Sequence, residues 1–453
     1  MKGRVYIRTF GCQMNVKDSE RMMGLLAAHG YGPAAGPDDA DVLLCNTCSV
    51  REKPEQKIMG VLGRWKALKQ NRPTLVTAVC GCVAQQKGQE FLDRLPWLSL
   101  VVGTQMVHRL PELVERARSG ERLAAVQWLE RGDPDLFAVP EMGQGTAVKG
   151  FVSIMQGCDN RCAYCIVPFV RGPAVSRRAD DVLREVKEMA ARGVKEVTLL
   201  GQNVNAYHDR GIGFPELLRL AAKAGVERVR FTTSHPKDLD DGLIEVMADD
   251  PRVMEAIHLP AQAGSDRVLR AMNRGYTRDG YLDLIRKLRA AMPEVGITAD
   301  LIVGFPGESE HDFQDTLRLL EEVRYDETFS FRYSPRPGTA AAGFAGQVPE
   351  PEKYQRLYRL QELQEGITQE KNQEQVSGSY EVLIEGPSKN DPGKLSGRTR
   401  SNRIVHIARD GVRPGDLVKV RVTRALKHSL EGEPCAPTAA LTGAFKEETC
   451  FWR

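Results

Sequence analysis

The chain has 453 residues, of which 42% are hydrophobic and 27% charged, with a formal net charge of only +3. This length and composition are those of an ordinary soluble protein of about three domains. No apolar run approaches the ~20 residues that cross a bilayer, and the start MKGRVYIRTFGC lacks the apolar core of a signal peptide. Membrane-spanning and secreted proteins are therefore excluded, and a cytoplasmic protein is expected.

The first ~120 residues alternate strands and helices in the pattern of a parallel α/β domain. The segments RVYIRTF, DVLLCNT and TLVTAVCG are predicted strands, and helices are predicted over 18–29, from about 54 to 70 and from about 85. Cys12, Cys48 and Cys82 then each lie at the carboxyl end of a strand. Because these ends converge on the ligand crevice of an open α/β sheet, cysteines far apart in sequence are expected to meet in space.

The ten cysteines of the chain are interpreted as ligands or catalytic groups, because disulfides are not expected in a reducing compartment. The eight histidines show no paired spacing, which favours iron–sulfur or zinc sites held by thiolates. Cys45 lies inside its strand and Cys80 beside a strand end, so both can be ordinary small buried residues. A redox pair at Cys45 and Cys48 is a further alternative, although the fold context of thioredoxin-like proteins is missing.

A second alternation of strands and helices follows a linker that is predicted over residues 131–150, which are rich in Gly and Pro. From Phe151, amphipathic helices separate six predicted strands: FVSIMQ, EVTLLG, RVRFTT, EAIHLP, ITADLIVG and ETFSFRY. Six such units fall short of the eight of a closed TIM barrel. A partial barrel is therefore expected, with its chemistry at the carboxyl ends of the strands.

The segment GCDNRCAYC follows the first strand of this barrel and places Cys158, Cys162 and Cys165 within eight residues. A tetrahedral metal site or a four-iron cluster that is held only by protein needs four ligands, so three cysteines leave one position open. A structural zinc site would need a fourth ligand from elsewhere in the chain, and three unconnected buried cysteines are a second alternative. The third interpretation is a four-iron cluster with one iron free for another molecule, as in catalytic metal sites.

Other residues at predicted strand ends are candidates for cofactor contacts. DLIVGFPGE places Gly304 and Gly307 just past a strand, where the backbone must approach a ligand closely. The remaining candidates are Tyr164 before the last cysteine, Gln202 and Asn203 in TLLGQNVN, Ser234 in FTTSHP and Gln262 in HLPAQAGSD. Each polar candidate can equally be a loop residue without a ligand.

The C-terminal part changes to short strands with Gly turns after a polar helix predicted from about 352 to 372. YEVLIEG, LSGRTRSNRIVHI and DLVKVRVTRAL predict a small β-barrel of the nucleic-acid-binding kind. Residues 378–430 hold 11 Lys and Arg against 5 Asp and Glu, so the rest of the chain totals −3. This basic module suggests a polyanionic partner, nucleic acid first, with a solubilising face as the alternative.

The spacing of GCDNRCAYC, with an aromatic residue before the last cysteine, resembles the radical S-adenosylmethionine (SAM) enzymes. The whole chain resembles one family of them, the methylthiotransferases, through FGCQMNVKDSE, CNTCSVREKPEQK, GCVAQ, GCDNRCAYCIVPFVRG, LPAQAGSDRVLRAMNRGYT and LSGRTRSNR. The resemblance implies an α/β protein with a Rossmann-like methylthiotransferase domain over 1–120, a linker over 121–146, a radical SAM core of (β/α)6 type over 147–376 and a TRAM domain over 377–445.

By this resemblance, two four-iron (4Fe–4S) clusters are expected, each with one iron free of protein ligands. Cys158, Cys162 and Cys165 would hold one, and Cys12, Cys48 and Cys82 the other. The first would bind SAM and yield a 5′-deoxyadenosyl radical, which takes a hydrogen from C2 of the substrate adenosine. A second SAM would methylate a sulfur on the other cluster. The C2–H bond is not acidic, so base catalysis by His or Glu cannot replace the radical.

Within the family, NTCSVREKPEQK is similar to the branch that methylthiolates C2 of N6-isopentenyladenosine at position 37 of tRNA. The alternatives are the same chemistry on N6-threonylcarbamoyladenosine or on a ribosomal-protein aspartate and, from another class, a non-catalytic metal-binding RNA protein. Pro173 and Ala174 stand where the family commonly has acidic residues, and Ala263 where Ser is common. These departures bear on substrate contacts and not on the clusters.

The expected partners are tRNA, bound at its anticodon stem-loop, and an electron donor protein such as a flavodoxin or ferredoxin. The sequence identifies no sulfur donor, and a monomer without membrane contacts is expected. Contacts to tRNA phosphates are expected from Arg398, Arg400, Arg403 and Lys419, each of which can also be a plain surface charge.

Overall fold

The structure, a computed structural model, describes residues 2–49, 52–130, 133–137, 148–389, 391–409 and 411–435. The chain divides into two compact units, Met1–Gln364 and Glu365–Arg453. Within the described ranges, no helix is both long and apolar enough to cross a membrane.

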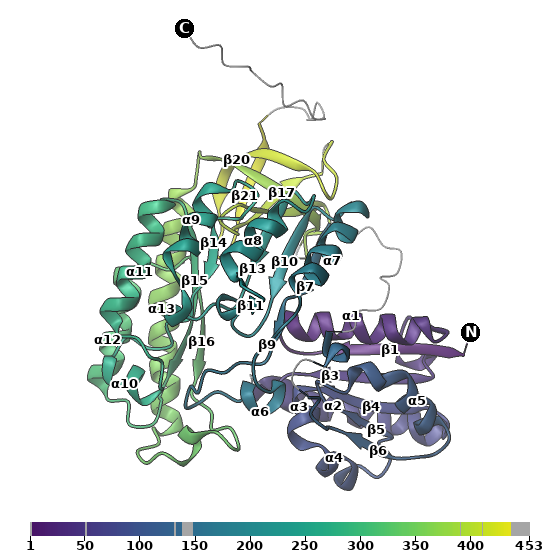
Figure 1. Cartoon of the computed structure of the whole chain (residues 1–453). Coiled ribbons are helices and arrows are strands. Elements are labelled where there is room, and N and C mark those ends of the chain that lie inside the picture. The colour runs from purple at the N-terminus through teal and green to yellow at the C-terminus, as the bar shows by residue number, and fades with distance from the viewer. Residues whose placement is uncertain are drawn as a thin grey trace. The chain divides into compact units, whose positions relative to one another are not determined.

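A six-stranded parallel sheet of order β2-β1-β3-β4-β5-β6 forms the N-terminal part of the first unit (Figure 1). Its strands are β1 (Gly3–Thr9), β2 (Tyr31–Pro33), β3 (Val42–Thr47), β4 (Val76–Gly81), β5 (Leu100–Val102) and β6 (Leu123–Ala125). The predicted parallel α/β fold is confirmed, with β1, β3 and β4 as the predicted strands. The prediction misses the three short strands β2, β5 and β6.

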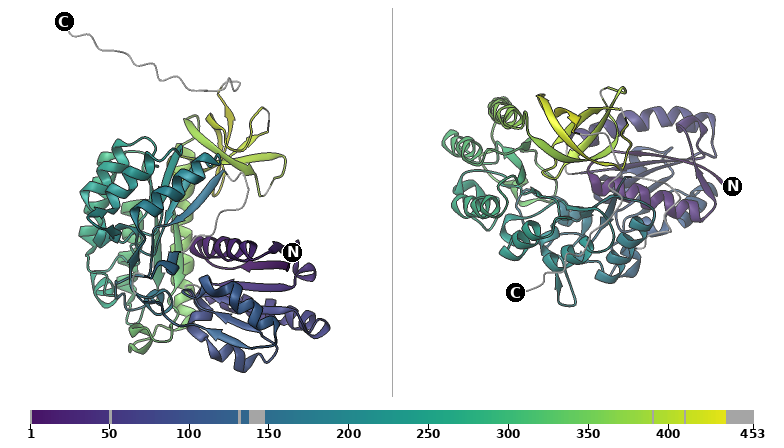
Figure 2. Two further views of the ribbon diagram at one scale, coloured as in Figure 1. Left: turned by 45° about the vertical axis from the view of Figure 1, so that its right-hand side comes forward. Right: turned by 90° about the horizontal axis from the view of Figure 1, so that it is seen from above.

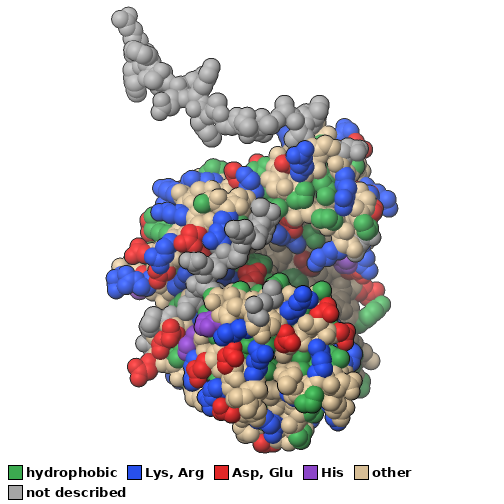
Figure 3. All heavy atoms as spheres, turned by 90° about the vertical axis from the view of Figure 1, so that its right-hand side faces the viewer, with side chains coloured by type: hydrophobic (Ala, Val, Ile, Leu, Met, Phe, Trp, Pro, Cys, Tyr) green, Lys and Arg blue, Asp and Glu red, His purple; other side chains and the backbone are tan. Residues whose placement is uncertain are grey.

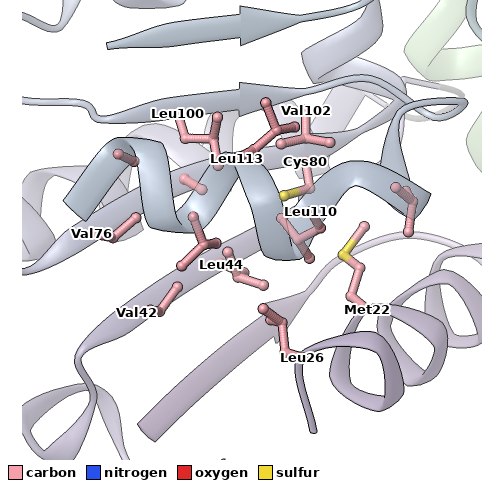
Figure 4. Close-up of a cluster of buried hydrophobic side chains, with 14 of the residues drawn as sticks. Met22, Leu26, Val42, Leu44, Val76, Cys80, Leu100, Val102, Leu110 and Leu113 are labelled. Carbon is pink, nitrogen blue, oxygen red and sulfur yellow. The ribbon is translucent and has the colours of Figure 1, made fainter. Parts of the chain in front are cut away.

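Helices cover both faces of this sheet, which is why its strands are almost continuously apolar. They are α1 (Gln13–Ala28), α2 (Glu52–Asn71), α3 (Cys82–Lys87), α4 (Gln89–Arg94) and α5 (Leu110–Arg118). On one face, Met22 of α1 and Leu110 of α5 pack against strand side chains such as Leu44 (Figure 4). On the other face, Leu62 of α2 and Phe91 of α4 pack in a second buried cluster.

Acidic and basic side chains are interspersed on the outward face of the sheet domain (Figure 3). The helix α5 of this domain carries exposed ion pairs, such as Arg109 with Glu112 and Arg116 with Glu121. Alternating charge of this kind keeps a surface soluble and contributes little to the stability of the fold.

The second part of the first unit is a partial barrel of six strands, as predicted. The strands are β7 (Lys149–Ser153), β10 (Glu196–Leu200), β13 (Arg228–Phe231), β14 (Ala256–His258), β15 (Gly296–Val303) and β16 (Glu327–Arg332). They form two parallel three-stranded sheets, and an isolated bridge pairs Val229 of β13 with Val253, which precedes β14. Around them lie α7 (Ala179–Ala191), α8 (Phe214–Ala222), α9 (Asp241–Asp249), α11 (Arg278–Ala291) and α12 (Glu310–Val323) (Figure 1).

Shorter elements fill the connections of the barrel. They are the antiparallel pair β8 (Met155–Gln156) and β9 (Val175–Ser176), the pair β11 (His208–Asp209) and β12 (Ile212–Gly213), and the helices α6 (Val167–Arg171) and α10 (Asp266–Ala271). Of the predicted linker, residues 131–132 and 138–147 lie outside the described part, and β6 lies within the stretch 121–146.

The second unit contains a closed five-stranded barrel of order β17-β18-β19-β21-β20, which confirms the predicted small β-barrel (Figure 2). The strands are β17 (Ser379–Pro387), β18 (Lys394–Thr399), β19 (Ile404–Ala408), β20 (Leu417–Ala425) and β21 (Leu430–Pro434). Inward residues such as Val382, Val405 and Val420 form its core. The predicted polar helix is α13 (Glu350–Glu374), which leads into this barrel.

Candidate functional site

Three cysteines lie at the carboxyl ends of the neighbouring strands β1, β3 and β4. Cys12 is the N-cap of α1, Cys48 follows β3 directly, and Cys82 begins α3 directly after β4. The thiol of Cys48 shares hydrogen bonds with both Cys12 and Cys82. The structure thus brings together the three residues that the sequence places at strand ends, and we refer to them as the N-terminal triad.

Electrostatics favour the thiolate form at Cys12 and Cys82, two of the three residues of the N-terminal triad. The hydrogen bond from Cys48 lowers the pKa of Cys12 to about 6 and that of Cys82 to about 7, against the opposing effect of burial. The same hydrogen bonds raise the pKa of Cys48. The guanidinium of Arg171 lowers the pKa of Cys12 and Cys82 further. Because thiolates are the form in which cysteine binds metals, the donor set fits an iron–sulfur cluster.

Buried amides hold the N-terminal triad in place. Asn15 Oδ1 accepts from the Cys12 backbone N–H and from its thiol, both at 3.3 Å, and Asn15 Nδ2 donates to the Thr47 carbonyl at 3.1 Å. Asn46 Nδ2 returns a bond to the Asn15 carbonyl at 2.8 Å. Asn15 therefore links the segments of Cys12 and Cys48. Sequence reasoning missed it, because an Asn in the first turn of a helix carries no signal of its partner.

The other two cysteines of this domain, Cys45 and Cys80, are fully buried in the sheet. Burial raises the pKa of Cys45 to about 12 and raises that of Cys80 still more strongly. Both are therefore neutral thiols in apolar surroundings, in agreement with the interpretation of these two residues as small core side chains.

Cys158, Cys162 and Cys165, here called the barrel triad, lie in the loop between β8 and α6. Gly157, which precedes them, has φ +81°, and its N–H donates to Gln202 Oε1. Arg274 Nη1 donates to Cys162 Sγ at 3.3 Å, and its Nη2 donates to the Pro260 carbonyl at 3.0 Å. Burial raises the pKa of Cys165 to about 12, so a positive partner such as Arg274 offsets part of the cost of the thiolates.

Several buried polar atoms near the strand ends of the barrel have no hydrogen-bond partner among the described residues. Three belong to predicted candidates: Asn203 Oδ1, Ser234 Oγ and Gln262 Oε1. Gln156 Nε2 and His235 Nε2 share this property, and sequence reasoning missed them. Buried polar atoms normally have partners, so these atoms at the strand ends are candidates for contacts with a polar ligand such as SAM.

His235 is neutral in this environment. Burial lowers its pKa to about 3, and the charges of Arg274 and Lys237 act in the same direction. Its Nδ1 accepts from the Lys237 N–H at 3.2 Å, which leaves the proton on Nε2. The unpartnered atom of His235 is therefore an N–H donor.

The remaining candidates of the barrel have described neighbours. Tyr164 packs against the cluster that includes Phe305 and Tyr333. Gly304 has φ +72°, and a Cβ there would lie 2.3 Å from Lys353 Cγ. Gly307 has φ +77°, and its N–H donates to the Gly346 carbonyl at 2.8 Å. These contacts explain the two glycines as turn residues, and their role toward a cofactor stays a prediction.

Neither triad is arranged for one metal ion. Within the described residues, no three side chains of His, Cys, Asp or Glu are grouped as a single ion requires. A four-iron cluster attaches each thiolate to a different iron, so three cysteines at each site would leave one iron for a non-protein ligand.

The basic candidates of the C-terminal barrel differ in exposure. Arg398 is partly buried, and its Nε pairs with Glu385 at 3.2 Å. Arg400 is also partly buried, and Arg403 Nη1 donates to Asn372 Oδ1 at 3.3 Å. Lys419 is exposed on β20, and Arg421, which sequence reasoning missed, is exposed two residues further on the same face. Lys419 and Arg421 are thus the more accessible of these charges.

Comparison with known proteins assigns each part of the chain to a family. Residues 4–103 match the model described as "Uncharacterized protein family UPF0004", residues 152–320 the Radical SAM superfamily and residues 373–435 the TRAM domain. The tRNA-2-methylthio-N(6)-dimethylallyladenosine synthase of Geotalea uraniireducens is 52% identical over 436 residues, which cover 95% of this chain and 98% of the relative. The protein of that name from Geobacter sulfurreducens is 51% identical and covers 95% and 97%.

Solved structures resemble the chain in fold. The radical SAM methyltransferase TsrM of Kitasatospora setae, with cobalamin and an iron–sulfur cluster bound, superposes with a TM-score of 0.54 at 13% identity over 76% of this chain and 74% of its own. The cobalamin-dependent enzyme OxsB, with aqua-cobalamin and SAM bound, gives a TM-score of 0.52 at 12% identity over 80% of this chain and 56% of its own. At such low identity the likeness concerns the fold alone.

Proposed function

The chain belongs to the tRNA-2-methylthio-N6-dimethylallyladenosine synthases, and from this premise we propose which of its residues carry the reaction. The enzyme inserts a methylthio group at C2 of N6-isopentenyladenosine in tRNA, the dimethylallyl and isopentenyl names denoting the same five-carbon substituent. The predicted family, the radical SAM chemistry, and SAM and the iron–sulfur clusters as cofactors are confirmed by this family membership.

The observation that carries the residue assignment is the presence of two groups of three cysteines in one unit of the protein. Cys158, Cys162 and Cys165 would hold the cluster that binds SAM, and Cys12, Cys48 and Cys82 the second one. When bound, such a cluster supplies the electron for radical chemistry and one iron without a protein ligand. The protein's own part is to present the thiolates, to fix their spacing and to shield them in part from water.

The unpartnered polar atoms at the strand ends would bind and orient SAM. Ser234 Oγ and Gln262 Oε1 can accept hydrogen bonds, and the neutral His235 offers the Nε2–H as a donor. Because these atoms lie on adjacent strand ends of a rigid barrel, the ligand would meet them already in place, which reduces the cost of binding.

Ser234→Ala separates a ligand contact from a structural one. The hydroxyl is buried without a partner among the described residues, so its removal is expected to leave the stability of the SAM-free protein unchanged or slightly higher. SAM affinity should fall about three- to tenfold, as for the loss of one hydrogen bond. Calorimetric titration of the anaerobically reconstituted protein measures the affinity, and thermal unfolding measures the stability.

The matched control is Asp240→Ala at the start of α9. Asp240 caps this helix by accepting the Leu243 N–H at 2.8 Å, so the variant should lose about 1 kcal/mol of stability and keep its SAM affinity. If Ser234→Ala lost stability and retained SAM affinity, the hydroxyl would have a structural role and not a ligand role.

The C-terminal barrel would hold tRNA phosphates through its exposed basic face. Replacing Lys419 and Arg421 together by alanine is expected to weaken tRNA binding and to reduce the slope of log Kd against log salt by about 2. Lys394→Ala is the control, because Lys394 pairs with Glu431 at 2.6 Å and is less available. Equal slopes for the double variant and the unaltered protein would remove this face from the tRNA site.

The domain limits, the location and the electron donor are proposals of the same kind. We place the domain limits at 1–120, 121–146, 147–376 and 377–445. We also place the protein in the cytoplasm as a monomer, and propose a flavodoxin- or ferredoxin-type protein as its electron donor.

Mass spectrometry of tRNA nucleosides from a deletion strain tests the substrate. The strain should lack 2-methylthio-N6-isopentenyladenosine, accumulate N6-isopentenyladenosine and regain the methylthio form when the gene is restored; an unchanged nucleoside profile would contradict the assignment.

A further inference from the structure

Arg171, the last residue of α6, is a buried arginine whose guanidinium makes only part of the hydrogen bonds that it can donate. Its side chain is 3% exposed, and Nη2 donates to Asp18 Oδ2 at 2.6 Å. Nη1 is buried and has no hydrogen-bond partner among the described residues. A buried guanidinium with a free N–H is costly, so it points to a negatively charged group on that side.

The position of Arg171 is fixed by packing between the two triads. The helix α6 follows Cys165 after one residue and packs on α3, where Cys82, Ile166 and Val170 form a buried cluster. The Thr104 hydroxyl donates to the Val170 carbonyl at 2.7 Å, which ties α6 to the N-terminal sheet domain. The same short helix therefore starts at the barrel triad and ends at the N-terminal triad.

Arg171 lies close enough to the N-terminal triad for its positive charge to interact with both Cys12 and Cys82. The neighbouring cations are engaged elsewhere: Lys17 Nζ lies 2.9 Å from Glu185 Oε1, and Arg177 also pairs with Glu185. Asp18 of α1 pairs with Arg171, and its negative charge offsets part of the positive potential that Arg171 produces at the cysteines. The net potential at the triad from this side therefore depends on both residues.

We propose that Arg171 is a positioning residue for the cluster of the N-terminal triad, which balances the negative charge of that cluster and keeps Nη1–H available to an anionic sulfur ligand held there. The proposal rests on the assignment of Cys12, Cys48 and Cys82 under the proposed function. Reduction adds negative charge to a cluster, so a nearby cation raises the reduction potential and a nearby anion lowers it. Loss of Arg171 should lower the potential, and loss of the Asp18 charge should raise it.

The test uses the full chain with Cys158, Cys162 and Cys165 replaced by alanine, so that only the N-terminal cluster is observed. Arg171→Gln, Arg171→Lys and Asp18→Asn are introduced into this background. Arg177→Gln is the control, because Arg177 is a buried arginine that pairs with Glu185. Electron paramagnetic resonance (EPR) follows the reduction potential of the cluster and, with added methanethiolate as the probe, its affinity for an anionic sulfur ligand.

Arg171→Gln is expected to lower the potential and to weaken methanethiolate binding about tenfold, the effect of one charge-assisted hydrogen bond. Arg171→Lys should retain most of both properties, Asp18→Asn should raise the potential, and Arg177→Gln should change neither. An assembled Arg171→Gln cluster with unchanged potential and affinity would overturn the inference. If that variant assembles no cluster, the sign of the Asp18→Asn shift decides. Absence of iron from the background protein itself would instead contradict the ligand assignment.

Discussion

Replacing Cys158 by alanine is expected to abolish methylthio transfer and to remove one of two clusters, leaving about four irons and four sulfides per chain where the unaltered protein holds about eight of each. Cys48→Ala should give the same stoichiometry through loss of the other cluster. The reason is that each site has three protein ligands, and two thiolates hold a four-iron cluster poorly. Iron and sulfide analysis after anaerobic reconstitution measures both variants.

Cys45→Ala and Cys80→Ala are the matched controls, since both residues are buried neutral thiols in the same sheet. They should retain the full iron content and lose about 1 kcal/mol of stability through a small cavity. Loss of a cluster in either control would mean that the triad is wrongly chosen. Stoichiometric zinc without iron in the unaltered protein would contradict the iron–sulfur interpretation altogether.

Gly157→Ala is expected to disrupt the loop of the barrel triad and to prevent assembly of the SAM-binding cluster. A Cβ at this position would lie 2.0 Å from the Pro173 carbonyl oxygen and 2.5 Å from that of Gly172, and backbone atoms cannot move aside cheaply. The loop must therefore shift, and the spacing of the three cysteines shifts with it. The iron content of the variant and its thermal stability measure the effect.

Gly193→Ala separates the clash from the cost of the backbone conformation. Gly193 has φ +87°, close to the +81° of Gly157, but a Cβ added there would have no described neighbour within 4 Å. The strain of a left-handed Ala costs about 1 kcal/mol in both variants. Gly193→Ala should therefore keep both clusters with slightly lower stability, and equal behaviour of the two variants would show that the contact with Pro173 is unimportant.

Hydrophobic periodicity predicted the parts of the fold in which long elements repeat. The strands β1, β3 and β4 and all six barrel strands could be predicted from the sequence. Each lies in an apolar segment that alternates with a segment of helical hydrophobic period. The three-residue strands β2, β5 and β6 gave no such signal. The helix α1 begins at Gln13 and not at residue 18 as predicted, because Cys12 takes the N-cap position that Ser, Thr, Asp or Asn usually fills.

The cluster ligands could be predicted because the spacing of cysteines in the sequence indicates a metal site. The side chains that surround them could not be predicted, because they are brought there by tertiary contacts. Cys158, Cys162 and Cys165 form a motif within one loop, and the strand-end positions of Cys12, Cys48 and Cys82 indicate their convergence. Arg171 and Arg274 each lie within a motif typical of the family, but nothing in the sequence says which sulfur an arginine will face. The neutral state of His235 likewise depends on burial, which only the fold determines.

The proposed reaction depends above all on the iron that the cluster of Cys158, Cys162 and Cys165 leaves free for SAM. Electron–nuclear double resonance observes this iron in the reduced Cys48→Ala protein, with SAM labelled with nitrogen-15 in its amino group. A hyperfine coupling between the label and the cluster is expected there, and none in the Cys158→Ala protein. A cluster that assembles in the Cys48→Ala protein, binds SAM and shows no coupling to the label would contradict the assignment.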